Sequence, residues 1–439
     1  MITALPNHAS SGDPLAESAR RAVRGWVTYD FANVIFSMNI ASLYFPLWVV
    51  KNAGGSDGQY GVASAASMLV VFLLAPIIGT MMDRTGRRLP VLMTSTILCC
   101  AFTVGLGYGG LWVALAVFAL ANATFGCGLV AYDALLPLVS TPETRGRVGG
   151  NGIAAGFGGA LVGIIVGLAI LTFDASAKPA VFKATALLFL LGSIPCFLWV
   201  KEPKTANRIG LRQAISETKH ELRGTVARAR GYPGVSRFLI GRVFYTDAAN
   251  TIFAFMGVYA AKEVGFSDLQ AQLVLLSGVL TGPAGAIAAG RSADRIGPKT
   301  TLDRLLLLWM AVLAACALIP LLGLPSWLFW FVTPFGGIAF GGTSATDRAL
   351  LLRITPPQHT GHFVGLFNMV GRFSAILGPL VWAVEVGWLG WGRPAAVATL
   401  AGFVVVSWVL FAPIDDRFRN WRESETAPPP VLEGAPFLT

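Results

Sequence analysis

The chain has few charged residues, and the residue types that usually carry enzymatic chemistry are scarce. Charged side chains make up 13% of its 439 residues, against roughly a quarter in a soluble globular domain. The four histidines show no metal-ligand spacing, no Cys-x-x-Cys pair is present, and no Gly-x4-Gly-Lys loop occurs that could cradle a nucleotide phosphate. We therefore expect no enzymatic activity, no resident metal and no cofactor.

Cysteine is also rare, and its placement argues against a disulfide framework. All five cysteines fall inside apolar runs: Cys99, Cys100, Cys127, Cys196 and Cys316. Thiols placed in this way are expected to stay free.

Apolar residues are correspondingly abundant, at 54% of the chain, and the mean hydropathy is +0.65. They gather into runs of around 20 residues, the length of helix that crosses a hydrocarbon core about 30 Å thick. The sequence thus predicts an all-α membrane protein with twelve transmembrane helices, over approximately residues 25–50, 60–82, 89–108, 111–136, 149–172, 179–200, 238–261, 268–290, 302–321, 326–350, 361–386 and 393–413.

The basic residues are distributed unevenly between the predicted loops. Of the 33 Lys and Arg residues, Arg242 and Arg372 fall within helices, and one side of the membrane holds only Lys51, Lys178, Lys183, Lys262 and Arg393. The others lie on the side that carries both termini and the central loop. Because basic residues are enriched on the cytoplasmic side, this predicts a multi-pass protein of the cell membrane with both termini in the cytoplasm.

The predicted helices divide the chain into two halves joined by a basic linker. The divisions are a flexible N-terminal tail (1–24), a six-helix half (25–200), the linker (201–237), a second six-helix half (238–413) and a disordered C-terminal tail (414–439). Within the linker, Leu211, Ile215, Leu222 and Val226 recur at helical spacing among basic residues. This pattern is typical of an amphipathic helix at a membrane surface, and we expect it to bind anionic lipid headgroups.

A loop motif occurs once in each half, at the end of the second predicted helix. Both copies read Gly-x3-Asp-Arg-x-Gly-x-[Arg/Lys], and the residues concerned are Gly79, Asp83, Arg84, Gly86, Arg87 and Arg88, and then Gly290, Asp294, Arg295, Gly297 and Lys299. The second glycine of each copy allows the chain to reverse. A basic loop that merely anchors the cytoplasmic face would explain the basic residues but neither the aspartate nor the glycines.

This motif resembles the loop signature of the major facilitator superfamily, whose members have twelve helices in two pseudo-symmetric halves. The resemblance implies that Asp83 meets the N-terminus of a helix from the opposite half, near Gly361. A carboxylate there would accept free N–H groups and be favoured by the helix dipole. Rocking the halves apart would break that contact, so the motif is expected to act as a conformational latch.

A second repeat opens each half: residues 30–36 match residues 247–253 at five of seven positions. The polar residues that these segments and the eleventh helix place inside the membrane are Asp30, Asn33, Ser37, Asp247, Asn250 and Arg372. Ionisable groups in a spanning helix are costly unless they face water, a partner charge or the bundle interior. Two interpretations stay open: these residues line a cavity that binds substrate or a proton, or they are paired groups that hold helices together.

Further residues resemble the vacuole effluxer family within the same superfamily. They include Gly25-Trp26, Tyr29-Asp30-Phe31-Ala32-Asn33, Tyr132-x-Ala134-Leu135-Leu136-Pro137 and Gly378-Pro379. Members of that family with an assigned role export amino acids, which is what the resemblance implies for the substrate. The chain departs from the family pattern at Phe31, Val34 and Asp133, positions that bear on substrate identity more than on fold.

We therefore expect a monomeric secondary active transporter that moves a small solute by alternating access. By resemblance the solute is an amino acid or a similar metabolite leaving the cytoplasm, and a proton bound at Asp30 or Asp247 is a candidate coupling ion. The alternative is a drug or toxic-metabolite antiporter of the same superfamily. From another class, a transport-dead receptor or assembly factor could use this scaffold, although the retained polar residues in the first and seventh helices speak against it.

Overall fold

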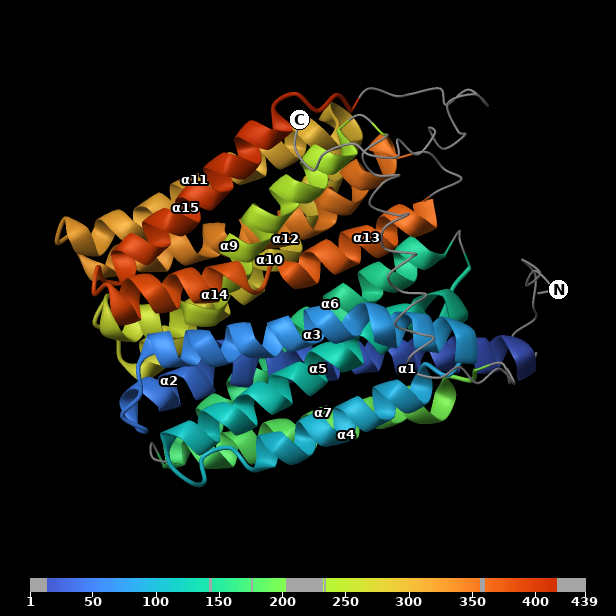
Figure 1. Cartoon of the computed structure of the whole chain (residues 1–439), viewed down its shortest axis with the longest axis horizontal. Coiled ribbons are helices and arrows are strands. Elements are labelled where there is room, and N and C mark those ends of the chain that lie inside the picture. Colours follow the sequence, from blue (N-terminus) through green and yellow to red (C-terminus); the bar gives the residue numbers. More distant parts are fainter. Residues whose placement is uncertain are drawn as a thin grey trace.

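The computed structural model describes residues 14–141, 144–174, 177–202, 232, 234–355 and 360–416. Long helices lie side by side in one bundle (Figure 1). The first half supplies α1 (Pro14–Phe36), η1 (Ser37–Leu43), α2 (Tyr44–Lys51), α3 (Asp57–Thr85), α4 (Leu89–Val104), α5 (Leu111–Val139), α6 (Arg145–Phe173) and α7 (Lys178–Trp199). The second supplies α9 (Val235–Lys262), α10 (Asp268–Ile296), α11 (Pro298–Leu321), η2 (Ser326–Leu328), α12 (Phe329–Ile354), α13 (Thr360–Phe373), α14 (Leu377–Trp382), η4 (Ala383–Trp388) and α15 (Arg393–Phe411).

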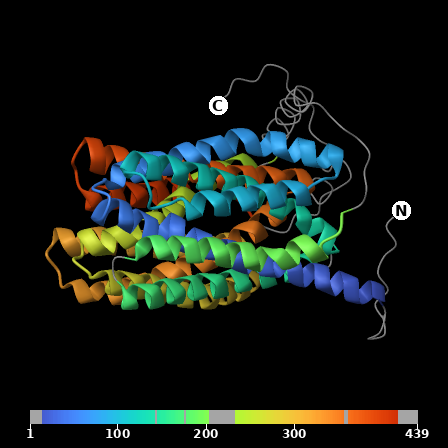
Figure 2. The same cartoon turned by 90° about the horizontal axis from the view of Figure 1, so that it is seen from below.

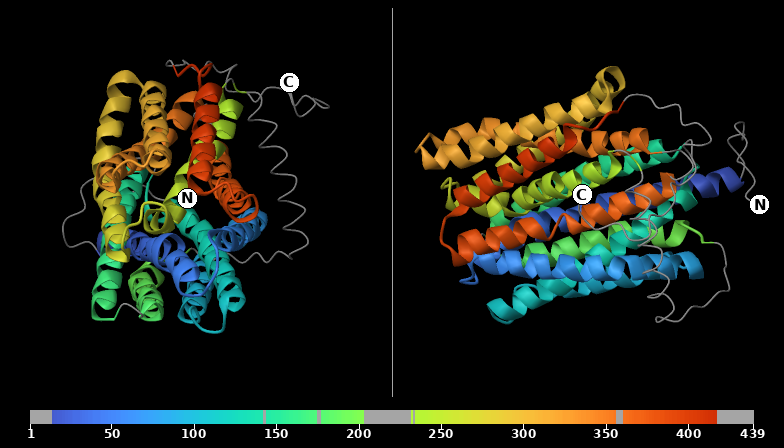
Figure 3. Two further views of the ribbon diagram at one scale, coloured as in Figure 1. Left: turned by 90° about the vertical axis from the view of Figure 1, so that its left-hand side faces the viewer. Right: turned by 45° about the horizontal axis from the view of Figure 1, so that its top comes forward.

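Over the described residues the chain runs through the bundle twelve times, in two groups of six, which confirms the predicted fold class. The α1–α7 group and the α9–α15 group occupy opposite sides of the bundle (Figures 1 and 3). Eight of the described helices are long and apolar enough to cross a membrane. Of the remaining passes, α4 is a shorter apolar helix and the eleventh pass is interrupted. Helices α9 and α12 contain charged and glycine residues, which lower their mean hydropathy.

The internal repeat extends to the way in which the second helix of each half begins and ends. Ser56 caps α3 and Ser267 caps α10, and each forms a reciprocal capping box with the glutamine three residues later. At the other end, Gly86 (φ 66°) and Gly297 (φ 91°) take backbone angles that side chains rarely tolerate. The motif glycines therefore reverse the chain, as the sequence predicts. The aspartate and arginine of each motif lie in the last turns of α3 and α10, because both helices run further than expected.

Glycines allow the helices of each half to pack with their backbones in near contact. A Cβ atom at Gly337 would lie 2.0 Å from the carbonyl oxygen of Gly278, and one at Gly341 would lie 2.0 Å from that of Gly282. These contacts join α10 to α12. The glycine-rich tenth pass is the continuous helix α12, and its glycines serve close packing.

The interruption falls in the eleventh pass, where the sequence predicts one helix over 361–386. Helix α13 ends at Phe373, three turn residues follow, and α14 gives way to the π-helical η4. Ser374 N still donates to Val370 O (3.0 Å) in the α-helical pattern, whereas Ile376 N donates to Phe373 O (3.2 Å), three residues back, so the chain tightens here. The break lies at the level of the central cavity described below.

The first helix begins earlier than predicted. Residues 14–24, expected to belong to a flexible tail, form the start of α1 (Figure 2). Proline fits the first helical position, and Glu17 in the first turn suits the positive end of the helix dipole. The proposed amphipathic linker helix and the rest of the C-terminal tail, residues 203–231 and 417–439, lie outside the described residues.

Candidate functional site

We call the end of the bundle where α1 begins and α15 ends the terminal face, and the opposite end, which carries Lys51 and Arg393, the far face. A cavity of about 580 Å³ lies between the two halves. Its wall is built by α1, η1, α3, α5 and α6 from the first half, and by α9, α10, α12, α13 and α14 from the second. This volume is typical of a site for a small organic molecule.

The wall combines apolar and aromatic surface with a few polar side chains. The polar residues are Asp30, Ser37, Ser42, Ser64, Asn122, Asn250, Thr251 and Ser344, and the aromatic ones are Phe125, Phe157, Phe253 and Phe340. Among the described wall residues, Asp30 is the only ionisable one. A solute in the cavity therefore meets one carboxylate within a largely apolar enclosure.

The two copies of the internal repeat are used differently. In the first half Asp30 lies on the cavity wall, and Asn33, which is buried, donates a hydrogen bond from Nδ2 to Asp30 Oδ1 at 3.0 Å. In the second half Asn250 lies on the wall, whereas Asp247 does not. The sequence left open whether the two aspartates line a cavity or hold helices together, and the structure separates them: Asp30 lies on the wall and Asp247 does not.

Asp247 is fully buried in α9, behind the cavity wall. Neither of its carboxylate oxygens has a hydrogen-bond partner among the described residues. The side chain faces α14, where a Cβ atom added to Gly378 would lie 3.1 Å from Asp247 Oδ2. Only a glycine at position 378 leaves room for this arrangement.

A π-helical segment, η1, shapes the cavity wall in the first pass. Its wider turns direct Ser37 and Ser42 to the cavity, while the buried Asn39 donates to Gly163 O (3.1 Å) and to Thr185 Oγ1 (2.9 Å). π-helical turns inside α-helices are rare and are often found at functional sites. The sequence placed Ser37 among the polar residues inside the membrane but gave no sign that the helix widens there.

One buried ion pair in the second half was missed by the sequence analysis. Arg242 Nε lies 3.1 Å from Asp347 Oδ2, and the Tyr245 hydroxyl lies 3.0 Å from the same oxygen. Arg242 also donates to Phe367 O at 3.0 Å and stacks on the Phe367 ring at 3.6 Å. This cluster ties α9 to α12 and α13.

Several predicted residues have side chains that the structure does not describe. They are Arg372 on α13 and the motif residues Asp83 and Arg84 on α3. The latch contact of Asp83 therefore stays a prediction. In the second half Asp294 is exposed, and no hydrogen bond to it is found among the described residues.

After each motif loop, a carboxylate binds the N-terminal end of the next helix. Glu202 Oε1 accepts hydrogen bonds from the backbone N–H groups of Arg88 and Leu89, the latter at 2.7 Å. Correspondingly, Asp416 Oδ2 accepts one from Lys299 N at 3.0 Å. Each acid follows the last helix of its half, so it fastens that helix to the motif loop at the terminal face.

At the far face, ion pairs join the two halves. Lys51 and Lys178 from the first half both bind Asp268 at the start of α10, with Lys178 Nζ 3.0 Å from Oδ2. Arg393 at the start of α15 binds Asp57 at the start of α3, with Nε 2.6 Å and Nη2 3.1 Å from the two oxygens. We call these two sets of pairs the far-face clamp.

Close packing reinforces the clamp. A Cβ atom at Gly58 would lie 3.1 Å from the Cα atom of Gly387 in η4. Deeper in the bundle, the Tyr44 hydroxyl of the first half lies 3.0 Å from Gln272 Oε1 of the second. Contacts of this kind can exist only while the far-face ends of the halves are together, so the structure shows a conformation closed at the far face.

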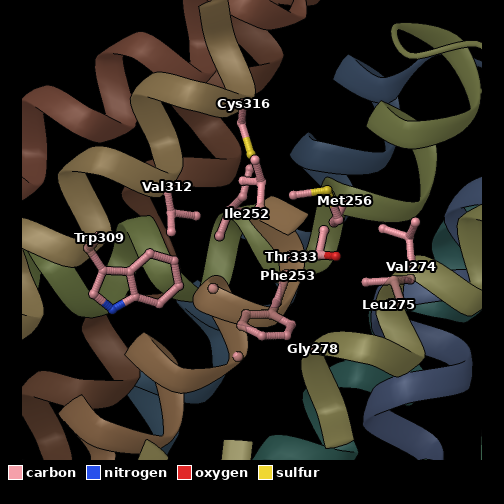
Figure 4. A pocket seen from close by; sticks show the side chains of 13 residues that line it. Ile252, Phe253, Met256, Val274, Leu275, Gly278, Trp309, Val312, Cys316 and Thr333 are labelled. Carbon is pink, nitrogen blue, oxygen red and sulfur yellow. The ribbon is translucent and has the colours of Figure 1, made fainter. Parts of the chain in front are cut away.

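A second, much smaller cavity of about 30 Å³ lies within the second half, among α9, α10, α11 and α12 (Figure 4). Its lining is apolar apart from the Thr333 hydroxyl and the Trp309 indole. Gly278 and Gly337 belong to the walls of both cavities. The small cavity has room for about one water-sized group, so the central cavity is the candidate solute site.

Sequence comparison decides the family. The profile of the Major Facilitator Superfamily matches residues 31–379 and 238–438. The chain belongs to the Major Facilitator Superfamily. It is thus a multi-pass membrane transporter and not an enzyme, as the sequence predicted.

The relatives span several kinds of transporter. The chain is 25% identical to the uncharacterized MFS-type transporter YxiO of Bacillus subtilis, over 87% of this chain and 92% of the relative. It is 27% identical to the class C tetracycline resistance protein of Escherichia coli (83% and 89%), and 24% identical to autophagy-related protein 22 of Vanderwaltozyma polyspora (60% and 58%). The last match confirms the resemblance to the vacuole effluxers.

Solved structures support the fold. A bacterial homolog of the human lysosomal transporter Spinster, in an inward-facing and unoccupied conformation, superposes with a TM-score of 0.65 at 14% identity, covering 92% of this chain and 97% of that one. At this identity the likeness concerns the fold alone.

Proposed function

We propose that this protein transports a small organic solute that carries a positively charged amine and an apolar body. Membership of the superfamily makes it a secondary transporter. The observation that carries the substrate class is the wall of the central cavity, where Asp30 is the only ionisable group among the described residues and phenylalanines surround it. A carboxylate in a largely apolar enclosure favours a cation over an anion of the same size.

Two substrate classes share this chemistry. Amino acids, which the vacuole effluxer resemblance favours, offer an ammonium group to Asp30 but also need a partner for their carboxylate. The hydroxyl and amide groups of Ser37, Asn122 and Asn250 could supply hydrogen bonds to it. A hydrophobic amine or cationic drug needs no such partner, and the aromatic wall of Phe125, Phe157, Phe253 and Phe340 favours it through cation–π contacts. The match to a tetracycline resistance protein is compatible with this second candidate.

The distribution of basic residues bears on the orientation of the protein in the membrane and on the direction of transport. The basic-residue asymmetry supports a cytoplasmic terminal face, and with that orientation a structure closed at the far face would be an inward-facing conformation. We propose that the protein works as a monomer in the cell membrane and carries solute outward in exchange for protons. The basic linker, residues 201–237, would lie on anionic lipid headgroups.

A ligand-induced thermal-shift series on purified full-length protein tests the substrate class. Leucine, its amide and the corresponding carboxyl-free amine differ only at the carboxylate, and a hydrophobic quaternary cation represents the drug class. A ligand at about one hundred times its Kd adds about 2.7 kcal/mol to the stability of the folded state. An amino-acid site responds to leucine above the two analogues, whereas a hydrophobic-cation site responds to the amine and the quaternary cation.

The matched variants are Asp30→Asn and, as a control away from the cavity, Asp303→Asn. Asp30→Asn should abolish the shifts produced by cationic ligands, and Asp303→Asn should keep them. Equal shifts in wild type and Asp30→Asn would remove Asp30 from the site and with it the argument for a cationic solute.

A further inference from the structure

Asp247 is a buried acidic residue outside the wall of the central cavity, so solute binding does not explain why it is there. It is fully buried, its two oxygens have no hydrogen-bond partner among the described residues, and the same holds for the hydroxyl of Thr251. The two side chains lie four residues apart and so share one face of α9. A Cβ atom at Gly378 would lie 1.9 Å from Thr251 Oγ1 and 3.1 Å from Asp247 Oδ2, so both oxygens meet the same point of α14.

Several charged groups on the elements packed around α9 are paired with residues other than Asp247, and Asp294 of α10 is exposed. On α9 itself Arg242 is bound to Asp347 of α12. On η4, Glu385 accepts a hydrogen bond from Thr399 of α15. At the far face, the pairs of Lys51 with Asp268 and of Arg393 with Asp57 and Glu263 bind the charged ends of α2, α10 and α15. Arg372 of α13 has a side chain outside the described residues.

A buried carboxylate anion that has only the Gly378 backbone beside it, and no positive partner among the described residues, is strongly disfavoured inside a membrane protein. A neutral carboxylic acid is far cheaper to bury there. Helix α14 packs closely on Asp247 Oδ2 and Thr251 Oγ1 at Gly378. A metal ion would need several oxygen ligands at this point, whereas a proton needs none. We propose that Asp247 is the coupling-proton site of this transporter, and that it holds a proton in the far-face-closed conformation. This inference rests on the proposed transport function and adds a second carboxylate with a separate task.

A route from the site to the cavity passes through Thr251. Thr251 lies on the same face of α9 as Asp247 and also belongs to the cavity wall, beside Asn250. In the first half the equivalent position is Val34, which also lies on the wall but cannot relay a proton. Release breaks the O–H bond of the Asp247 carboxyl group, and the proton passes by way of the Thr251 hydroxyl to water in the cavity.

We infer that α14, in the interrupted eleventh pass, is the segment that moves when the proton is released. The carboxylate left after release needs hydration or a positive partner, so it can persist only if α14 withdraws from α9. The three turn residues that precede α14 allow this segment to move separately from α13. Broken helices at the level of the binding site are a recurrent feature of secondary transporters. Proton release would thereby be tied to the conformational change.

Infrared spectroscopy of the full-length protein in lipid nanodiscs tests the proposal without knowledge of the solute. A protonated buried carboxyl group has a C=O stretching band distinct from that of a carboxylate. The band should be present in wild type at neutral pH, lost in Asp247→Asn and retained in Asp30→Asn. Its persistence in Asp247→Asn, or its absence from wild type, would overturn the proposal. So would its loss when sodium replaces choline at constant pH, because the site would then bind a metal cation.

Thr251→Val tests the route and also covers the case in which Asp247→Asn does not fold. Valine keeps the branched shape and removes the hydroxyl, so the C=O band should remain and move in frequency. The carboxyl proton of Asp247 should exchange more slowly for deuterium in deuterated buffer. The matched control is Val34→Thr, the same exchange made in reverse at the equivalent position, which should leave the deuterium exchange rate unchanged. An unchanged rate in Thr251→Val would refute the route through this hydroxyl.

The two proposals fail in different ways. Amine binding is read by thermal shift and depends on Asp30, whereas the infrared band depends on Asp247. If no amine binds but the band follows Asp247, the solute class is wrong and the proton site stands. If amines bind through Asp30 but the infrared band is unchanged in Asp247→Asn, the proton inference is wrong and the proposed function stands.

Discussion

The far-face clamp makes a quantitative prediction about the conformational equilibrium. The Asp57 side chain is 1% exposed and that of Arg393 is 21% exposed. Removing one partner of a buried ion pair costs about 3–5 kcal/mol, because the other charge is left without compensation. Since Arg393 is partly exposed, we take the lower end, about 3 kcal/mol. In the far-face-open conformation Asp57 is hydrated, so Arg393→Ala should lower the ratio of closed to open protein about a hundredfold.

Double electron–electron resonance between spin labels at Trp112 and Leu322, both more than half exposed near the far face, would measure this shift. Arg393→Ala should add a population with a longer distance across the far face. The double variant Arg393→Ala/Asp57→Asn should recover part of the closed population, because no buried charge is then left unpaired. Unchanged distances in Arg393→Ala, or the same change in the control Glu17→Gln, which breaks an exposed pair with Arg21 outside the motif, would refute the clamp.

Three further predictions follow from packing, topology and the loop motif. Gly341→Ala should lower the stability by about 1–3 kcal/mol and reduce Tm, because the added Cβ meets the backbone of α10; Gly402→Ala, where the Cβ meets open space, should not. A cysteine at Gly54 should react with an impermeant thiol reagent in intact cells, and one at Gly210 only after lysis; early labelling at the latter would reverse the orientation. Asp83→Asn should change the populations seen by spin-label distances while leaving the ligand-induced thermal shift intact, and the opposite pattern would contradict its role as a latch.

The parts of the fold that depend on local physics could be predicted from the sequence. Each pass needs a run of about 20 apolar residues, so the number of passes follows from counting runs. The repeats of residues 30–36 and 247–253 established two equivalent halves, and the capping boxes at Ser56 and Ser267 show that the equivalence extends to single hydrogen bonds. The breaks had no such signal, because η1 and the turn residues before α14 carry sequences that would also form regular α-helix.

The pairing of buried charges could not be predicted, because it depends on the rotation of helices that are distant in sequence. Arg242 and Asp347 lie 105 residues apart, and spacing along either helix does not reveal that they meet. One physical signal was available: an arginine within a spanning helix needs a carboxylate. That requirement would have limited the search to a few acids but would not have distinguished Asp347 from Asp247.

On our two proposals, the repeat aspartates of the duplicated halves have different tasks. Asp30 and Asp247 open near-identical segments, so local sequence assigns them the same environment. Their neighbours differ: Asn33 hydrogen-bonds Asp30 at the cavity wall, whereas Gly378 admits Asp247 into the contact between α9 and α14. A carboxylate that faces the cavity can bind and release a solute in either conformation, but one sealed behind the wall can exchange its proton only when α14 moves. On this proposal the sealed site links proton release to the movement of α14, while Asp30 stays available to the solute.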